Sequence, residues 1–348
     1  MTDFEIMCSF ENLYNAYKKA RKGKRDKAAC AEFELKTLDN IARLREELVS
    51  KTYRMQKYNR FMVHEPKERV VMASSFRDRI VQHSLCDNVL QKRIVKSFIY
   101  DNYASQKGKG THFGLRRLHK FMHQYYCNHG SEGWILKGDI SKYFYSIDHD
   151  ILKKQIQRYV RDKDILNLCY LVIDSTEGKG LPIGNQTSQT FALLYLSGLD
   201  HLLKDEIGVK YYGRYMDDFY IIHHDKEELK KLLEIIQCEV EKLGLKLNPK
   251  TQIFPLKNGI DFLGFHSYLT DSGKIVKKLR RKSKNNVKRR LRKMVSLRKR
   301  GMIDRKKVLM SYNCWMNHAK HGNTYHLRKN IEEEFGAKVE AKKGSVSK

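Results

Sequence analysis

The apolar positions of the first part of the chain predict helices on either side of a short hairpin. Residues 1–50 are charged and carry apolar side chains at helical spacing, among them Leu38, Ile41, Leu44 and Leu48. Strand-like apolar triplets follow at 61–63 and 70–72, with a proline-containing turn between them. Helical spacing returns over 76–98, and 105–114 is a loop with several glycines and lysines.

The middle of the chain alternates strand patterns with helical ones. An apolar run at 134–136 indicates a buried strand, and 209–223 indicates two strands around a Met-Asp-Asp turn. Further strands are expected near 252–254 and 260–266. Apolar residues at helical spacing predict helices over 150–173, 188–203 and 227–243.

The composition changes sharply after Gly273. Fifteen of the 27 residues from Lys274 to Arg300 are Lys or Arg, and none is acidic. Apolar residues still recur at helical spacing within this run, so we expect a basic amphipathic helix over 274–300. We place a domain boundary near residue 270.

The charge of the whole chain narrows the class of partner. The 348 residues carry 69 Lys and Arg against 40 Asp and Glu, a net charge of +29, which favours a polyanion because each neutralised phosphate releases counterions. A membrane is the rival partner, but no apolar run is long enough to span a bilayer and the start lacks a basic leader pattern. Seven scattered cysteines without a C-x-x-C pair agree with reduced thiols. We therefore expect a cytoplasmic protein with no membrane partner.

Acids within apolar runs are candidate metal ligands. Asp217 and Asp218 interrupt β-favouring residues, and Asp139 follows the apolar run at 134–136. An adjacent acid pair is most often a solvated turn, and a lone strand-end acid is most often a helix cap or an exposed side chain. If the two strands are neighbours, however, the three carboxylates converge. They could then hold two Mg²⁺ ions that stabilise the attacking and leaving oxygens of a phosphoryl transfer.

Six segments resemble, in order and spacing, the motifs of reverse transcriptases, and the resemblance covers roughly residues 50 to 330. Any one motif is a weak signal, whereas the ordered set is a strong one. The segments are Arg77 to Gln82 (R-D-R-I-V-Q), Asp139 to Phe144 (D-I-S-K-Y-F), Leu181 to Gln189 (L-P-I-G-N-Q-T-S-Q), Tyr215 to Asp218 (Y-M-D-D), Leu247 to Thr251 (L-N-P-K-T) and Phe262 to Phe265 (F-L-G-F).

The resemblance implies an α+β fold, a right-hand polymerase with fingers, a ferredoxin-like palm and a helical thumb. It implies an N-terminal helical extension over 1–50, fingers over 51–133, a palm over 134–268 with a helical fingers insertion at about 150–180, and a basic helical thumb over 269–348. We expect no RNase H, endonuclease or separate DNA-binding domain.

The implied activity is DNA synthesis on an RNA template from dNTPs with two Mg²⁺ ions, for which Mn²⁺ could substitute. Asp139, Asp217 and Asp218 would be the catalytic metal ligands, and Ile140 would add a backbone carbonyl. Phe144 would crowd a ribose 2′-hydroxyl. Ordinary exposed positions are the alternative for the basic members of the implied nucleotide-binding set, which is Lys67, Arg69, Phe144, Ile183, Gly184, Gln189 and Lys250.

The segment at Leu181 departs from the family's common pattern. Most members carry Q-G-x-x-x-S-P, whereas this chain has I-G-x-x-x-S-Q, with Ile183 and Gln189 at the changed positions. This variant resembles the error-prone enzymes of diversity-generating retroelements. Ile183 cannot donate the hydrogen bonds of a glutamine amide, and a lost positioning contact weakens discrimination between nucleotides. A local packing change is the simpler interpretation, and group II intron-like, retron or phage-defence enzymes, or a non-catalytic RNA-binding maturase, are the alternatives.

The C-terminal part of the resemblance concerns nucleic acid. Phe262, Leu263 and Gly264 would form the primer grip. A template RNA and an RNA/DNA duplex are the implied partners, and a diversity-generating enzyme would add a basic oligomeric accessory protein. Phosphates would be bound by Lys277, Lys278, Arg280, Arg281, Lys284, Lys288, Arg289 and Arg292.

One weaker signal points to a different metal. His119, His123 and Cys127 recur every fourth residue, so one helix face could present all three to a zinc ion. No fourth ligand is evident, and ordinary helix-face residues are the simpler interpretation.

Overall fold

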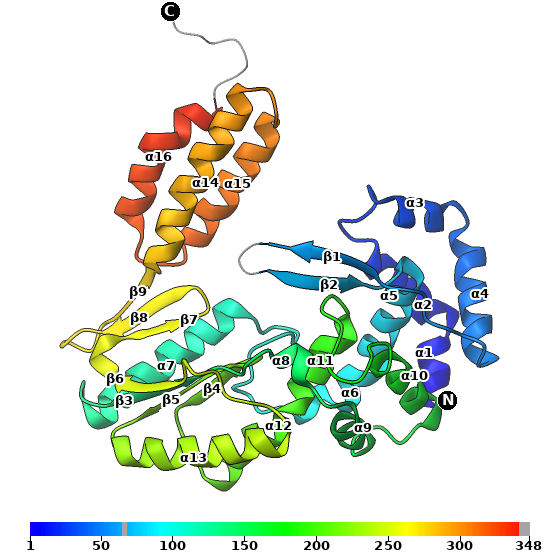
Figure 1. Cartoon of the computed structure of the whole chain (residues 1–348), viewed down its shortest axis with the longest axis horizontal. Helices are drawn as coiled ribbons and strands as arrows, with labels where there is room; N and C mark the ends of the chain where they lie inside the picture. Colours follow the sequence, from blue (N-terminus) through cyan, green and yellow to red (C-terminus); the bar gives the residue numbers. More distant parts are fainter. Residues whose placement is uncertain (65–67, 341–348) are drawn as a thin grey trace, which may run out of the picture. The chain divides into compact units, whose positions relative to one another are not determined.

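The computed structural model describes residues 1–64 and 68–340, which divide into two compact units. The first unit contains Met1–Gly114, Leu136–Ile221 and Glu227–Gln252. The second contains Leu115–Ile135, Ile222–Lys226 and the residues from Ile253 onward. Helices and strands occur in both (Figure 1), so the expected α+β class is confirmed.

The chain begins with the helical segment that its apolar spacing predicted. Ile41, Leu44 and Leu48 are buried, whereas Leu38 is exposed. The first helix starts at a capping box, in which the Thr2 hydroxyl accepts from the Glu5 N–H and the Glu5 carboxylate accepts from the Thr2 N–H. The helices are α1 (Asp3–Cys8), α2 (Phe10–Ala20), α3 (Ala28–Leu35) and α4 (Thr37–Val49).

The predicted hairpin follows, with antiparallel strands in which Val63 pairs with Arg69. Its strands are β1 (Asn59–Val63) and β2 (Arg69–Ala73). The helical pattern of 76–98 is confirmed, although it is divided into α5 (Phe76–Leu85), a π turn η1 (Cys86–Leu90), α6 (Gln91–Arg93) and a 3₁₀ turn η2 (Val95–Ser97).

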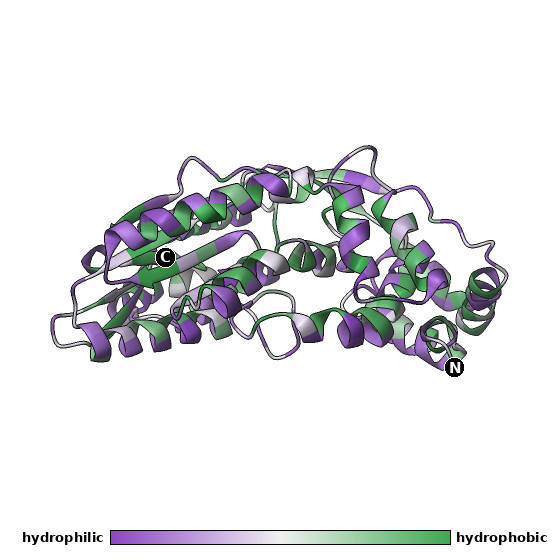
Figure 2. Cartoon of the chain, turned by 90° about the horizontal axis from the view of Figure 1, so that it is seen from below, coloured by the Kyte–Doolittle hydropathy of each residue, from purple (hydrophilic) through white to green (hydrophobic). Residues whose placement is uncertain are grey.

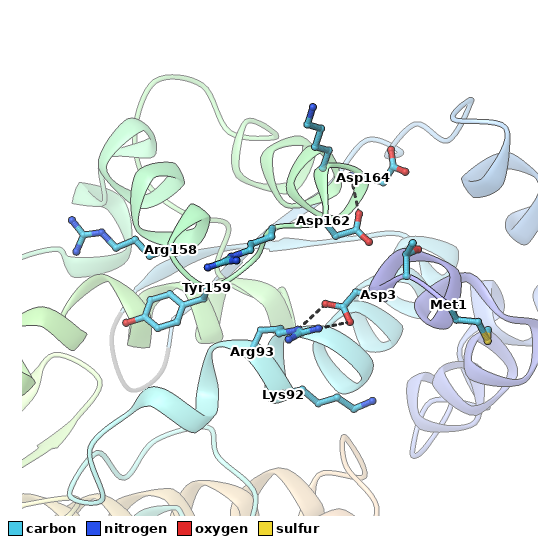
Figure 3. A pocket seen from close by; sticks show the side chains of 11 residues that line it. Met1, Asp3, Lys92, Arg93, Arg158, Tyr159, Asp162 and Asp164 are labelled. Carbon is cyan, nitrogen blue, oxygen red and sulfur yellow. Dashed lines mark hydrogen bonds and ion pairs between the residues drawn. The ribbon is translucent and has the colours of Figure 1, made fainter.

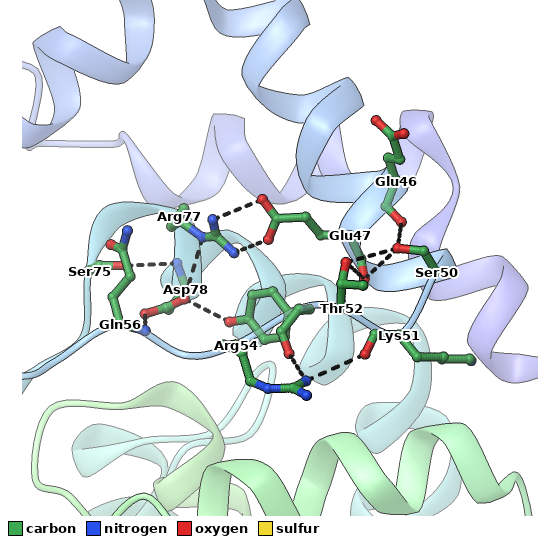
Figure 4. Close-up of polar contacts among 11 residues, drawn as sticks. Glu46, Glu47, Ser50, Lys51, Thr52, Arg54, Gln56, Ser75, Arg77 and Asp78 are labelled. Carbon is green, nitrogen blue, oxygen red and sulfur yellow. Dashed lines mark hydrogen bonds and ion pairs between the residues drawn. The ribbon is translucent and has the colours of Figure 1, made fainter.

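A buried acid fixes the start of α5 to the segment that leads into β1 (Figure 4). The Asp78 side chain is inaccessible to solvent and accepts from the Tyr53 hydroxyl at 2.7 Å and from the Gln56 N–H at 3.0 Å. Its neighbour Arg77 donates to both carboxylate oxygens of Glu47 on α4, at 3.1 and 2.5 Å. Because a buried carboxylate without partners is very unfavourable, these contacts hold α4, α5 and the entry to β1 in one arrangement.

The largest sheet has four strands in the order β4-β5-β3-β6. Gly138, on β3, passes so close to β5 that a Cβ atom there would lie 2.1 Å from the Phe219 ring, so a larger residue would force the ring to move. The strands are β3 (Trp134–Gly138), β4 (Tyr212–Tyr215), β5 (Asp218–His223) and β6 (Gln252–Pro255).

Helices connect the strands of this sheet. Between β3 and β4 lie α8 (Tyr143–Ser146), α9 (His149–Gln157), α10 (Lys163–Ile173), α11 (Gln186–Tyr195), α12 (Ser197–His201) and the π turn η3 (Leu202–Glu206). Between β5 and β6 lies α13 (Lys226–Lys242). Hydrophobic and hydrophilic residues alternate around most helices, as expected when one face is buried (Figure 2).

Two predicted helices are wrong in extent. The helix expected over 150–173 is interrupted after Gln157, and the Asp162 carboxylate starts α10 by accepting from the N–H groups of Asp164 and Ile165. The helix expected over 188–203 begins earlier, at Gln186, and is broken at Leu196. Apolar residues continue on both sides of each break, so their presence alone did not reveal the breaks.

The second unit combines one long helix, a three-stranded antiparallel sheet and three C-terminal helices. The helix is α7 (Thr111–His129), and a 3₁₀ turn η4 (Leu256–Asn258) precedes the sheet. The strands pair in the order β7 (Ile260–Phe262), β8 (Phe265–Leu269) and β9 (Ile275–Leu279). The C-terminal helices are α14 (Arg281–Lys299), α15 (Arg305–Ala319) and α16 (Tyr325–Glu340).

The helix predicted over 274–300 is wrong at its start. Ile275–Leu279 form β9, in which Ile275 pairs with Leu269 and Leu279 pairs with Phe265. The pairing partner precedes the basic run, so the charge pattern of that run could not show it. From Arg281 onward the helix is confirmed, with Val287 and Leu291 buried.

The boundary predicted near residue 270 lies in the turn between β8 and β9. The division into extension, fingers, palm and thumb stays a prediction, because compactness alone does not assign those roles. No helix in the described ranges combines the length and the apolar content needed to cross a bilayer.

Candidate active site

Asp139 follows β3 and is fixed by the loop after α13. The Asn248 side-chain amide donates to a carboxylate oxygen of Asp139 at 3.1 Å, and the Asn248 N–H donates to the Asp139 carbonyl at 2.7 Å. The next residue, Ile140, is buried and forms an antiparallel bridge with Leu247. The sequence segments at Asp139 and at Leu247 therefore lie side by side.

Asp217 lies in the turn between β4 and β5. The register pairs Tyr215 with Asp218, which leaves Met216 and Asp217 as a two-residue turn. Met216 adopts a left-handed conformation with φ 57°, unusual for a residue with a Cβ atom. The Arg214 guanidinium donates to the Met216 carbonyl at 2.6 Å and so holds the turn in this conformation.

Arg214 is itself fixed by a fully buried ion pair. Its Nε and Nη2 donate to the two carboxylate oxygens of Asp200 at 2.7 and 2.5 Å, and both side chains are inaccessible to solvent. The Tyr212 hydroxyl donates to the same carboxylate at 2.6 Å. Arg214 and Asp200 were not among the predicted site residues. An arginine inside an aromatic strand was the available signal, since such a charge needs a buried partner.

The Asp217 carboxyl group lies near those of Asp139 and Asp218. Burial, followed by the negative charge of Asp139, raises the pKa of Asp217 to about 7, and the charge of Asp218 acts in the same direction. The turn therefore gathers more negative charge than its surroundings neutralise. A proton on Asp217 relieves this excess, and a divalent cation would relieve it in the same way.

Asp218 has a different partner. The Lys137 ammonium, on β3, lies 2.7 Å from Oδ1 of Asp218, and the two side chains are 23% and 28% exposed. Lys137 was not predicted for the site, although a lysine within an apolar strand calls for an acidic partner. Thus the three predicted acids lie near one another, and Asp218 is also paired with a lysine.

The donor set fits Mg²⁺ through the Asp139–Asp217 pair. In the described part of the chain, no group of three or more His, Cys, Asp and Glu side chains has the spacing of a formed metal site. Mg²⁺ commonly binds one or two protein carboxylates and completes its shell with water and phosphate oxygens. Asp218 would join such a site after separating from Lys137.

Among the described residues, no such group includes the zinc ligands considered on α7. The His119 Nε2 lies 2.9 Å from the Ser267 hydroxyl, and burial lowers the pKa of His119 to about 4. The Cys127 sulfur lies 3.7 Å from Nδ1 of His123. These contacts explain His119 as a packed helix residue, which is the simpler interpretation given above.

Phe144 lies on α8, directly after the Asp139 segment. The adjacent Tyr143 is buried, donates its hydroxyl to the Ala192 carbonyl on α11, and meets the Phe144 ring edge-on at 5.8 Å between centroids. The Leu181 N–H donates to the Phe144 carbonyl at 2.7 Å. The structure therefore brings Phe144 beside the segment that begins at Leu181.

The loop at Ile183 and Gly184 lies against β2. The Met72 N–H donates to the Ile183 carbonyl at 2.9 Å. Gly184 has φ 132°, and a Cβ atom there would lie 3.0 Å from the Met72 carbonyl, so this close approach requires glycine. Arg69 is exposed at the start of β2, and Lys67 lies outside the described residues. The strand that carries Arg69 and the segment that departs from the family pattern are thus neighbours.

Gln189 and Lys250 are both exposed. The Gln189 amide oxygen accepts from the Ser105 hydroxyl at 2.7 Å. The Lys250 N–H donates to the Asn248 side chain at 3.0 Å, which places its backbone two residues from the partner of Asp139.

The predicted primer grip is a tight hairpin turn in the second unit. Phe262 pairs with Phe265, and both are buried. Leu263 and Gly264 form the two-residue turn between them, with φ values of 47° and 90°. Two successive left-handed residues match the twist of the flanking strands.

The eight predicted phosphate-binding residues differ in how they are engaged. Arg280 pairs with Asp261 at 2.9 Å, and Lys288 and Arg292 pair with Glu334 on α16 at 3.2 and 2.7 Å. The ammonium groups of Lys277 and Lys278 each lie 5.1 Å from an aromatic ring centroid. The other three have neither an acidic partner nor an aromatic contact in the described part of the chain: Arg281, Lys284 and Arg289.

The chain belongs to the reverse transcriptase (RNA-dependent DNA polymerase) family, whose model matches residues 63–267, more than half of its length. It therefore carries the RNA-directed DNA polymerase domain of that family. The predicted family is confirmed at this level.

Two curated relatives are distant. Protein YkfC of Escherichia coli K12 is 23% identical over 267 residues, which covers 64% of this chain and 69% of YkfC. The putative COX1/OXI3 intron 1 protein of Saccharomyces cerevisiae is 25% identical over 197 residues, which covers 52% of this chain but only 23% of that protein. The similarity therefore includes an intron protein but does not distinguish one type of retroelement.

Solved telomerase structures share the fold. The apo telomerase of Candida tropicalis truncated from its C-terminal domain aligns with a TM-score of 0.50 and 15% identity, over 68% of this chain and 59% of that one. The telomerase of Candida albicans in complex with a TWJ fragment of telomeric RNA gives 0.50 and 14%, over 83% and 56%. At such identity the likeness concerns the fold alone.

Proposed function

We propose that this chain synthesises DNA on an RNA template, with Asp139, Asp217 and Asp218 as the ligands of two divalent ions. The observation that carries the proposal is the Asp139–Asp217 carboxyl pair, with its raised Asp217 pKa, inside a reverse transcriptase domain. When bound, the ions would activate the primer 3′-hydroxyl and neutralise charge on the leaving pyrophosphate. Ile140 would add its carbonyl to this set.

The strand order supports the finer architecture. A β-α-β-β-α-β succession with the order β4-β5-β3-β6 is that of a ferredoxin-like sheet, as expected for a palm. On this proposal, residues 51–133 are fingers, 134–268 are the palm and 269–348 are the thumb, after an N-terminal extension.

The chain's own residues would bind the incoming dNTP around this acidic turn. Phe144 would crowd the 2′ position of the sugar, and Arg69, with Lys67, would bind the triphosphate. The contact between Met72 and Ile183 supports this grouping, because it fixes the strand of Arg69 to the loop of Ile183 and Gly184. Gln189 and Lys250 complete the proposed nucleotide-binding set.

Primer extension on an RNA template tests the proposal. We expect extension that needs a divalent ion, is lost in Asp217→Asn, and is retained in Asp150→Asn, which changes an exposed acid at the start of α9. Phe144→Ala should raise the use of rNTPs relative to dNTPs. Template-directed extension that survives in Asp217→Asn would overturn the site assignment, and RNA binding without any incorporation would favour a non-catalytic maturase.

The type of enzyme is a second, narrower proposal. Ile183 and Gln189 favour the error-prone enzyme of a diversity-generating retroelement over group II intron-like, retron or phage-defence types. Ile183 contributes only its backbone carbonyl to the Met72 contact, and its side chain offers no donor to a nucleotide. A basic oligomeric accessory protein would be a partner of such an enzyme.

Sequencing the cDNA decides between these types. A diversity-generating enzyme should make errors mainly at template adenines, and Ile183→Gln should reduce them. Equal fidelity at all four template bases would rule out this type while leaving RNA-directed synthesis intact.

A further inference from the structure

A basic cavity of about 910 Å³ opens in the first unit among elements that carry none of the acidic site (Figure 3). Its walls are the start of the chain through the first residue of α1, the end of α6, and the turn between α9 and α10 with the first residues of α10. We call it the α6–α10 cavity.

The acids that line the α6–α10 cavity are all engaged by the protein. Asp3 accepts from the Arg93 guanidinium at 2.8 and 3.1 Å. Asp162 accepts from the Phe4 N–H at 3.0 Å and caps α10. Asp164 pairs with Lys51 at 2.7 Å. Their negative charge is therefore neutralised or directed away from the cavity.

Four cations on the same walls have no acidic partner within the described ranges: Lys92, Arg158, Arg161 and Lys163. All four are exposed. Tyr159, partly exposed, lines the cavity between Arg158 and Arg161 along the chain. The cavity thus offers several unneutralised charges beside one aromatic ring.

We propose that the α6–α10 cavity binds a single-stranded segment of RNA, at a second site distinct from the acidic turn. Spaced cations suit successive phosphates, and an aromatic ring among them suits a stacked base, the combination by which proteins bind single strands. The planar guanidinium groups of Arg158 and Arg161 match phosphate oxygens. An acidic peptide would leave the ring without a base to stack on.

Charge-neutralising variants of the full-length chain test the site with a short oligouridylate as probe. In Arg158→Gln/Arg161→Gln/Lys163→Gln, we expect the slope of log affinity against log salt to fall by about 2, since each single-strand phosphate contact contributes about 0.7. The matched control is Lys230→Gln/Lys231→Gln/Lys242→Gln on α13, which removes the same charge from lysines already paired with glutamates. The control should keep the slope of the unmodified chain.

Two further measurements complete the test. The lysine variant Arg158→Lys/Arg161→Lys should retain the slope, and photo-crosslinked RNA should map to residues 158–163. Equal weakening in the cavity variant and the control, or a loss of binding to anionic vesicles with RNA binding unchanged, would overturn the proposal.

The RNA-binding test of the α6–α10 cavity can fail while the proposed DNA synthesis holds, and the reverse is also possible. Binding at the cavity should persist in Asp217→Asn, and extension of a short pre-annealed RNA/DNA duplex should persist in the cavity variant. Loss of oligouridylate crosslinking at residues 158–163 in Asp217→Asn would contradict a separate site.

Discussion

The carboxyl group of Asp217 makes metal binding at the acidic turn depend on pH. Its pKa of about 7 in the folded chain exceeds the ordinary value of 3.8. Between these values the folded state holds a proton that the unfolded state has lost. The ion-free fold is therefore favoured toward pH 4 and loses this contribution as the pH rises through 7.

Mg²⁺ must displace that proton, so its affinity should be about tenfold weaker at pH 6 than at pH 8. Asp217→Asn should stabilise the ion-free chain at pH 8 by roughly 2–4 kcal/mol, because it removes the buried charge. Calorimetric titration with Mg²⁺ and denaturant unfolding at both pH values measure these effects. An affinity that does not change with pH would contradict the raised pKa of Asp217.

Lys137 competes with a metal ion for Asp218. Removing its charge with Lys137→Met should lower the Mg²⁺ concentration needed for half-maximal extension several-fold, because two cations near one carboxylate repel. Lys137→Arg should change it little. A higher Mg²⁺ requirement in Lys137→Met would show that the lysine positions Asp218 for the ion instead.

Residue types within motifs could be predicted, but their contacts could not. Asp139, Asp217 and Asp218 stand in recognisable segments, and the fold places them near one another. The Lys137–Asp218 pair joins positions 81 residues apart. Arg214 can hold the turn because its guanidinium is fixed by an ion pair with Asp200. The sequence around Arg214 does not indicate that Asp200 is its partner.

At the scale of elements, the approach of β3 to β5 depends on Gly138. Gly138→Ala should destabilise the chain by about 1–3 kcal/mol or more, because the Phe219 ring occupies the space that the added methyl group needs. Gly198→Ala is the matched control, since nothing lies within 4 Å of its added methyl group in α12. It should be neutral or stabilising by up to about 1 kcal/mol. Equal unfolding midpoints in urea for both variants would contradict the packing.

Element type was predictable where local pattern and tertiary pairing agree. The hairpin of β1 and β2, and helix α13, follow their apolar patterns closely. Strand β9 does not follow its local pattern. It lies inside the basic run from Lys274 to Arg300, but Ile275 and Leu279 pair with β8, which precedes that run. The turn at Leu263 and Gly264 needs two left-handed residues, and leucine at the first gives no sequence signal for it.

For the whole molecule, the charge of +29 is not equally available to nucleic acid. On α14 and just before it, Arg280, Lys288 and Arg292 are paired with acids, whereas Arg281, Lys284 and Arg289 are not. Neutralising the unpaired three should reduce the salt slope of RNA/DNA duplex binding by about 2–3, and neutralising the paired three should reduce it less. Equal slopes would show that total charge, and not its pairing, governs binding.

The central claim is that the three aspartates catalyse RNA-templated DNA synthesis. Single-turnover incorporation of one dNTP on an RNA/DNA primer–template, at saturating Mg²⁺, tests it most directly. We expect Asp139→Asn, Asp217→Asn and Asp218→Asn each to lower the rate by about 10³-fold or more, with Asp150→Asn unchanged. Wild-type rates in any of the first three variants would contradict the assignment of that aspartate, and no template-dependent incorporation by the unmodified chain under any divalent ion would contradict the proposed function.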